Sequence, residues 1–98
     1  DRLDESMIRK ITDLRLNELA NRLAQKNISL SVDDAAKDYI AREGFDQQFG
    51  ARPLKRAIQN LLENPIAKKL LAGQVLEGDT VHVRMSGNEL VISSERSA

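Results

Sequence analysis

The sequence predicts an α+β domain, in which three to four helices pack on a small, mostly antiparallel sheet of three strands. Three patterns predict this class: apolar residues recur at helical spacing over 4–25, alternate strictly over 28–32, and form a hairpin pattern over 80–93. A chain of 98 residues and 11.0 kDa has the size of one small domain. We expect residues 1–93 to form this domain and residues 94–98 to form a disordered tail.

The first helix, expected over residues 4–25, has apolar residues on two sides. One side carries Leu3, Met7 and Leu14, and the other carries Ile8, Leu16, Leu19 and Leu23. In so small a domain, such a helix is either wrapped by its own core or packs on that core with one side and on another surface with the other. The sequence leaves both possibilities open.

The alternation over residues 28–32 predicts a strand with one buried face. Asp33 and Asp34 follow it and suit the first turn of a second helix, because a carboxylate caps the N–H groups there and its charge complements the helix dipole. We expect this helix to end at Gly44, since glycine is common directly after a helix.

A third helix is expected to begin at Pro53, because the fixed φ of proline suits the first helical turn. Asn64-Pro65 is expected to break or kink this helix, since proline lacks an N–H and disfavours helical geometry in the preceding residue. A short fourth helix is expected over residues 66–72, before Gly73.

The C-terminal part of the chain predicts a hairpin, with strands over 80–85 and 89–93 and a two-residue turn at 87–88. The register set by this turn places four apolar residues on one face, pairing Met85 with Leu90 and Val83 with Ile92.

Composition argues against several classes of site and partner. Basic and acidic residues both number 15, so no net charge attracts nucleic acid or an anionic membrane, and no apolar run approaches the roughly 20 residues needed to cross a bilayer. There is no cysteine, and His82 is the single histidine, so we expect no metal site. The chain begins at Asp1 without a signal peptide, and we expect it to be a fragment of a longer protein.

The start of the third helix breaks a rule that the second helix obeys. Arg52 precedes it, Lys55 and Arg56 lie in its first turn, and no acidic residue is among them. Cations are unfavourable there, but together with unpaired helix N–H groups they form a place for an anion, and arginine suits phosphate. The alternative is a solvated face whose cations pair with Glu63 or with other acidic residues.

Two segments carry a resemblance to a known family. GARPLKRAI (50–58) and ENPIA (63–67) resemble the sensor-2 region of AAA+ Clp unfoldases, and most closely the small C-terminal subdomain of the second ATPase module of the ClpB disaggregase family. The likeness extends over most of the chain. Gln47-Gln48 depart from it, where a Pro-Val-like pair is expected in the loop.

The resemblance implies specific roles. Arg52 matches the sensor-2 arginine, which contacts the β- and γ-phosphates of ATP held by the neighbouring large subdomain, and Gly50 and Ala51 match residues that line the nucleotide edge of that cleft. Ile8 or Ile11 is a candidate for approaching the adenine. The implied partners are the large subdomain, the adjacent subunits of a hexameric ring, and unfolded or aggregated proteins handled by the whole chaperone, in the cytoplasm or an organelle matrix.

The chain itself lacks a G-x-x-x-x-G-K-[ST] phosphate loop and an acidic strand end for Mg²⁺, so we do not expect it to hydrolyse ATP alone, but as part of an ATPase. A second hypothesis is a free-standing protein–protein interaction module with no nucleotide role, which binds a partner through its sheet edge or its first helix, with Leu19 and Leu23 as the contact residues of that helix. A third hypothesis, nucleic-acid binding, has little support, because the net charge is zero and aromatic residues are 3% of the chain.

Overall fold

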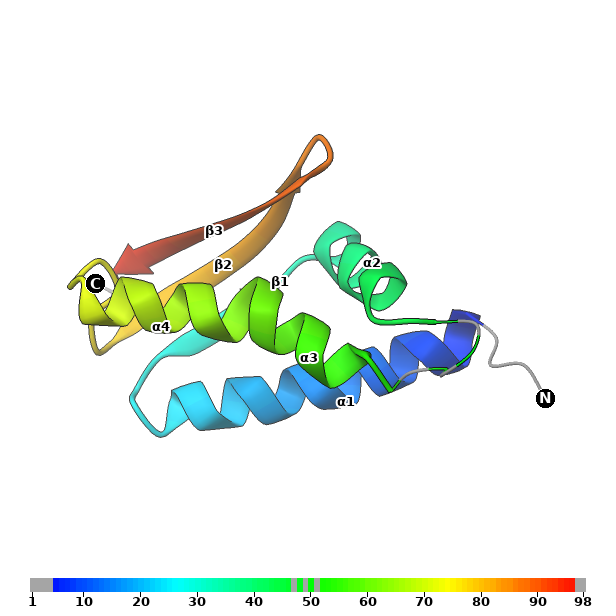
Figure 1. Ribbon diagram of the computed structural model, residues 1–98. Coiled ribbons are helices and arrows are strands. Elements are labelled where there is room, and N and C mark those ends of the chain that lie inside the picture. Colours follow the sequence, from blue (N-terminus) through cyan, green and yellow to red (C-terminus); the bar gives the residue numbers. More distant parts are fainter. Residues whose placement is uncertain (1–4, 47, 49, 51, 97–98) are drawn as a thin grey trace.

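The computed structural model describes residues 5–46, 48, 50 and 52–96, and it shows the expected α+β architecture (Figure 1). The elements in chain order are α1 (Glu5–Ala24), β1 (Ser29–Val32), α2 (Asp34–Glu43), α3 (Leu54–Ile58), the π-helical turn η1 (Gln59–Glu63), α4 (Asn64–Leu71), β2 (Asp79–Ser86) and β3 (Glu89–Arg96). In Figure 1, α1 and the ribbon that runs from α3 to α4 lie side by side, and the hairpin of β2 and β3 lies behind them.

The core lies between the helices and one face of the sheet. Its buried apolar residues come from the helices, from β2 and from two connecting segments: Leu16, Leu19, Leu23, Ile28, Ala36, Ile40, Leu54, Ile58, Leu62, Ile66, Val75, Val81 and Val83. β1 adds half-buried Leu30 and Val32. β3 adds half-buried Leu90 and Ile92 at the edge of this cluster.

Only one of the two apolar sides of α1 is covered. Leu19 is 1% exposed, whereas Met7 is 47% and Leu14 is 56% exposed. The domain is therefore not thick enough to wrap α1, and the side carrying Met7 and Leu14 faces solvent in this chain. Leu3, expected on the same side, lies outside the described residues.

The sheet has the strand order β1-β2-β3, in which β1 is parallel to β2 and β2 is antiparallel to β3. The predicted hairpin register is confirmed, since Met85 lies opposite Leu90 and Val83 opposite Ile92. β3 continues to Arg96, so residues 94–96, which we expected in a disordered tail, are the end of a strand. Residues 97–98 of that predicted tail lie outside the described residues.

The second helix begins as predicted and ends as predicted, but for a different reason. Asp33 caps it by accepting a hydrogen bond from the Ala36 N–H at 2.8 Å. Gly44 follows its last residue with φ −93°, which is not the left-handed geometry that favours glycine after a helix. Glycine is needed because of close packing: a Cβ at Gly44 would lie 2.8 Å from the Leu54 Cα.

The expected break at Asn64-Pro65 is absent. The backbone continues from α3 through η1 into α4, which begins at Asn64 rather than at residue 66. The wider π-helical turn accommodates Pro65, whose ring would clash with the carbonyl four residues earlier in a regular helix. The expected end holds, with Gly73 at φ +76° just after the helix.

Candidate functional site at the start of the third helix

The loop between α2 and α3 closes into a tight turn beside the predicted phosphate-binding residues. The Gly50 N–H donates to the Asp46 carbonyl at 2.6 Å, and the Asp46 N–H donates to the Gly50 carbonyl at 2.8 Å. Gly50 adopts φ +64°, a conformation that glycine enters at little cost. The structure therefore supplies a backbone reason for glycine at this position. Ala51 lies outside the described residues.

Arg52 follows this turn and is exposed, directly before Pro53 and two residues before the first residue of α3. No side chain caps α3, and its first turn holds no acidic residue. Exposed Lys55 and Arg56 lie on the same turn. The three cations that the sequence analysis grouped together thus gather at one helix start, where positive charge and N–H groups coincide.

Glu63 is not the ion-pair partner of Lys55 or Arg56. It pairs with Arg22 of α1, with 3.3 Å between the Arg22 Nε and the Glu63 Oε2. Among the described residues, neither Lys55 nor Arg56 forms an ion pair. The alternative that these two cations pair with Glu63 is therefore wrong.

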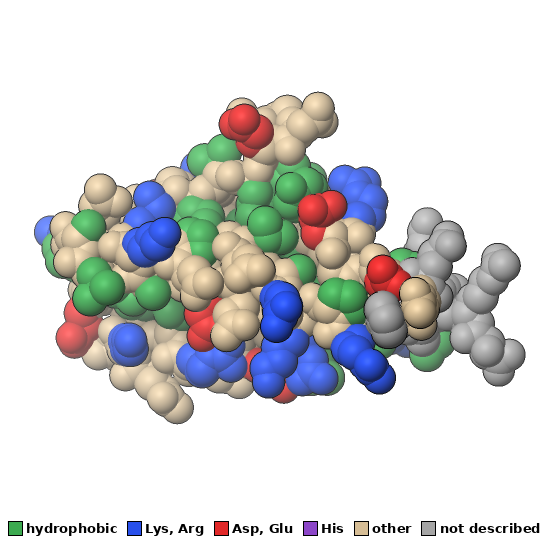
Figure 2. Space-filling view, viewed as in Figure 1, with side chains coloured by type: hydrophobic (Ala, Val, Ile, Leu, Met, Phe, Trp, Pro, Cys, Tyr) green, Lys and Arg blue, Asp and Glu red, His purple; other side chains and the backbone are tan. Residues whose placement is uncertain are grey.

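Lys and Arg side chains gather where α1 lies beside α3, as Figure 2 shows along the lower edge of the face in view. Arg15, Arg22 and Lys55 line a small cavity of about 40 Å³ there. Arg15 pairs with Glu18 of the same helix at 3.1 Å. On the other side of α3, Arg56 lines an open hollow of about 300 Å³ with Glu43, Pro53, Ala57, Asn60 and Leu61.

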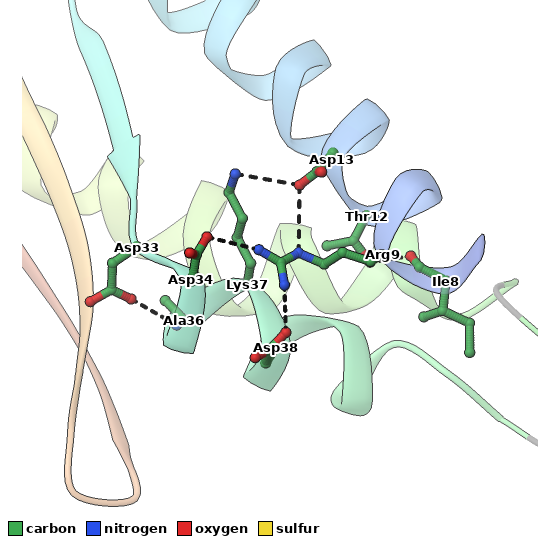
Figure 3. A network of polar contacts seen from close by, with 9 residues as sticks. All are labelled: Ile8, Arg9, Thr12, Asp13, Asp33, Asp34, Ala36, Lys37 and Asp38. Atoms are coloured by element: carbon green, nitrogen blue, oxygen red, sulfur yellow. Dashed lines mark hydrogen bonds and ion pairs between the residues drawn. The ribbon is translucent and has the colours of Figure 1, made fainter. Parts of the chain in front are cut away.

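A second polar cluster joins α1 to α2, and sequence reasoning did not find it (Figure 3). The Arg9 guanidinium donates to Asp38 at 2.6 Å and to Asp34 at 2.9 Å, both on α2. The Asp13 carboxylate lies 3.8 Å from the Arg9 Nε and 3.4 Å from the Lys37 Nζ. The spacing of Arg9 and Asp13 within one helix was a visible signal, but the pairing between helices was not.

The chemistry open to these residues is electrostatic. No group of three or more metal-ligating side chains occurs in the described part of the chain, and none of its helices has the length and apolar character that crossing a membrane requires.

Ile8 and Ile11, the candidates for an adenine contact, are both half-buried, and Ile11 packs against the core. A cationic helix start can bind and orient an anion, but it offers no nucleophile.

Comparison with known proteins identifies the family. Residues 3–83 match the family described as the C-terminal, D2-small domain of ClpB protein. The chain is 48% identical to Chaperone protein ClpB 1 of Parasynechococcus marenigrum (strain WH8102) over 93% of its length and 11% of that relative. It is 43% identical to Chaperone protein ClpB of Clostridium perfringens (93% of the chain, 10% of the relative) and 44% identical to that of Rickettsia prowazekii (94% and 11%). The chain thus spans about a tenth of the length of these curated relatives. This chain belongs to the ClpB family, as a C-terminal D2-small domain.

Proposed function

We propose that this chain is the sensor-2 subdomain of a ClpB-type ATP-dependent disaggregase, and that Arg52 binds the β- and γ-phosphates of ATP held by the neighbouring large subdomain. The observation that carries the proposal is the placement of an exposed Arg52 between the Gly50 turn and an α3 start without acidic residues. The family match supports the same assignment, because its relatives are ClpB chaperones.

The residues present suit a phosphate group. A guanidinium binds phosphate through two parallel hydrogen bonds, and the first N–H groups of α3 have no side-chain cap to compete with it. ATP would supply the phosphates and its bond energy. The chain's own contribution is to hold the Arg52 charge at the mouth of the cleft, with Gly50 and Ala51 along the nucleotide edge. When Arg52 binds phosphate, this domain is drawn toward the large subdomain, and phosphate loss releases it.

Arg52→Ala is expected to lower ATP turnover roughly hundredfold to thousandfold, or to lower nucleotide affinity, since one preorganised donor to a charged transition state is worth about that much in turnover. The experiment uses a ClpB protein that carries this chain as its D2-small domain, with steady-state ATP hydrolysis and nucleotide titration as measurements. Because Arg52 is exposed, thermal unfolding should change little. Lys68→Ala, an exposed cation of α4, is the matched control and should leave both parameters as they are. Unchanged turnover and affinity in the Arg52 variant would contradict the proposal.

The partners we propose are the large subdomain of the same protein and the adjacent subunits of a hexameric ring, with unfolded or aggregated proteins as the substrates of the whole chaperone. The uncovered side of α1 supports a docking role, since Met7 and Leu14 are exposed apolar residues on one helix side. The same observation keeps an interaction module without a nucleotide role as the second candidate function. We propose a cytoplasmic location, with an organelle matrix as the alternative.

Met7→Ser combined with Leu14→Ser separates these roles. We expect the pair to weaken ring assembly several-fold, seen by sedimentation velocity at decreasing protein concentration, because two apolar contacts are lost at an interface. Leu19 and Leu23, which the sequence suggested as contact residues, are unsuitable for this test, since they are 1% and 7% exposed and belong to the core. Assembly at full strength would remove α1 from the docking surface. If Met7→Ser with Leu14→Ser abolished assembly while Arg52→Ala changed neither ATP turnover nor nucleotide affinity, the second candidate would be favoured.

A further inference from the structure

We propose that Arg9 is a positioning residue for Arg52: it fixes α2 on α1, and α2 in turn sets where the start of α3 presents the Arg52 side chain. The inference rests on the proposed function, because it concerns the same phosphate-binding residue. Arg9 contacts α1 and α2, whereas Arg52 precedes α3, so Arg9 would act through the fold rather than through the nucleotide.

The first step is the contact between α1 and α2. Arg9 is the one described side chain that reaches three carboxylates, with Asp38 and Asp34 on α2 and Asp13 on α1 (Figure 3). The Arg9 side chain is 30% exposed, and its Nε is shut off from solvent. Two of the three carboxylates lie one turn apart on α2, so the planar guanidinium contacts that helix at two points. Two contacts oppose a rotation of α2 about its axis. Lysine, with a single ammonium group, offers no such fork.

Lys37 closes the cluster from the opposite helix. Its Nζ lies 3.4 Å from the Asp13 Oδ1, an oxygen that is also buried without a hydrogen-bond donor. Each helix therefore supplies a cation that pairs with a carboxylate of the other: Arg9 of α1 pairs with α2, and Lys37 of α2 pairs with α1. Crossed ion pairs of this kind fix the position of α2 along α1 more firmly than one pair would.

The second step leads from α2 to α3. Gly44 directly follows α2, and its Cα packs so closely on Leu54 that no Cβ fits between them. Leu54, the first residue of α3, is 1% exposed. Close-packed contacts transmit displacement rather than absorb it. A shift of α2 therefore moves Leu54, and with it Arg52 two residues earlier.

The third step concerns the loop. Asp46 and Gly50 exchange two backbone hydrogen bonds, which hold these two residues of the connection from α2 to α3 together. Arg52 thus lies between this paired turn and the buried Leu54. Both of these depend on the placement of α2, which Arg9 secures.

The test is a double-mutant cycle in a ClpB protein that carries this chain. Arg9→Met alone is expected to weaken nucleotide affinity or ATP turnover by about tenfold or less, because a misplaced binding group loses much of its effect. In the Arg52→Ala background, Arg9→Met should have no further effect, since the group it positions is gone. Arg9→Lys keeps the positive charge beside these carboxylates but lacks the two-pronged guanidinium, so it should recover only part of the loss.

Arg22→Met is the matched control. Arg22 is also an α1 cation that bridges to another helix, Glu63 of η1, and within the described residues it forms no ion pair with α2. It should cost stability without the nucleotide effect, with thermal unfolding of each variant as the common measure. Equal effects of Arg9→Met with and without Arg52 would overturn the inference. A silent Arg52→Ala would instead overturn the proposed function itself, so the two failures are distinguishable.

Discussion

Gly44→Ala is expected to destabilise the domain by about 3 kcal/mol, the upper end of the usual cost of overpacking a core. An added Cβ would lie 2.8 Å from the Leu54 Cα and 3.1 Å from its Cβ, and no rotamer change of Leu54 moves those atoms. The junction of α2 and α3 would have to open instead. Urea unfolding followed by circular dichroism measures the loss as a lower midpoint at constant slope.

Gly73→Ala is the control that separates packing from backbone conformation. Gly73 has φ +76°, and an added Cβ would meet no atom within 4 Å. Its cost should be about 1 kcal/mol, from the left-handed backbone alone. If both substitutions lowered the midpoint equally, the contact with Leu54 would not be the cause of the loss at Gly44.

Leu62→Ala should cost a similar amount, about 3 kcal/mol, by leaving a cavity at the centre of the core. Leu62 is 0% exposed and lies in the π-helical turn, where Pro65 restricts the backbone conformation. Little collapse around the missing methyl groups is therefore possible. Thermal and urea unfolding should both report the loss.

Leu71→Ala makes the same chemical change at a surface site. Leu71 is 89% exposed at the end of α4. Its removal should alter the free energy of unfolding by no more than about 0.5 kcal/mol. A large effect at Leu71, or a small one at Leu62, would show that the core is not where the structure places it.

Local patterns predicted much of the fold from the sequence. The hairpin register followed from a two-residue turn and alternating side chains, because both are set by neighbours in the chain. Asp33 as a helix cap and Gly73 as a helix end have the same local origin. Resemblance, rather than pattern, singled out Arg52 among the three cations at the start of α3.

Features that depend on distant parts of the chain escaped prediction. The role of Gly44 depends on Leu54, which lies across a loop, whereas propensity indicated only that glycine is common after a helix. The π-helical turn satisfies two requirements at once: it keeps Leu62 in the core, and it avoids the regular helical geometry that Pro65 disfavours. The first of these depends on the tertiary packing. The Arg9 cluster needs the relative placement of two helices, which no periodicity encodes.

The parallel pairing of β1 with β2 has a consequence for how the chain reaches its native state. Ser29 pairs with Thr80, so this pairing closes a loop that contains every residue between them. The β2–β3 hairpin can form early, because its strands are adjacent in sequence. We expect β1 to pair later than the hairpin, because its pairing closes a longer loop and this entropy cost is offset by the packing of α2, α3 and α4. A nascent chain that ends before β2 has no strand with which β1 can pair.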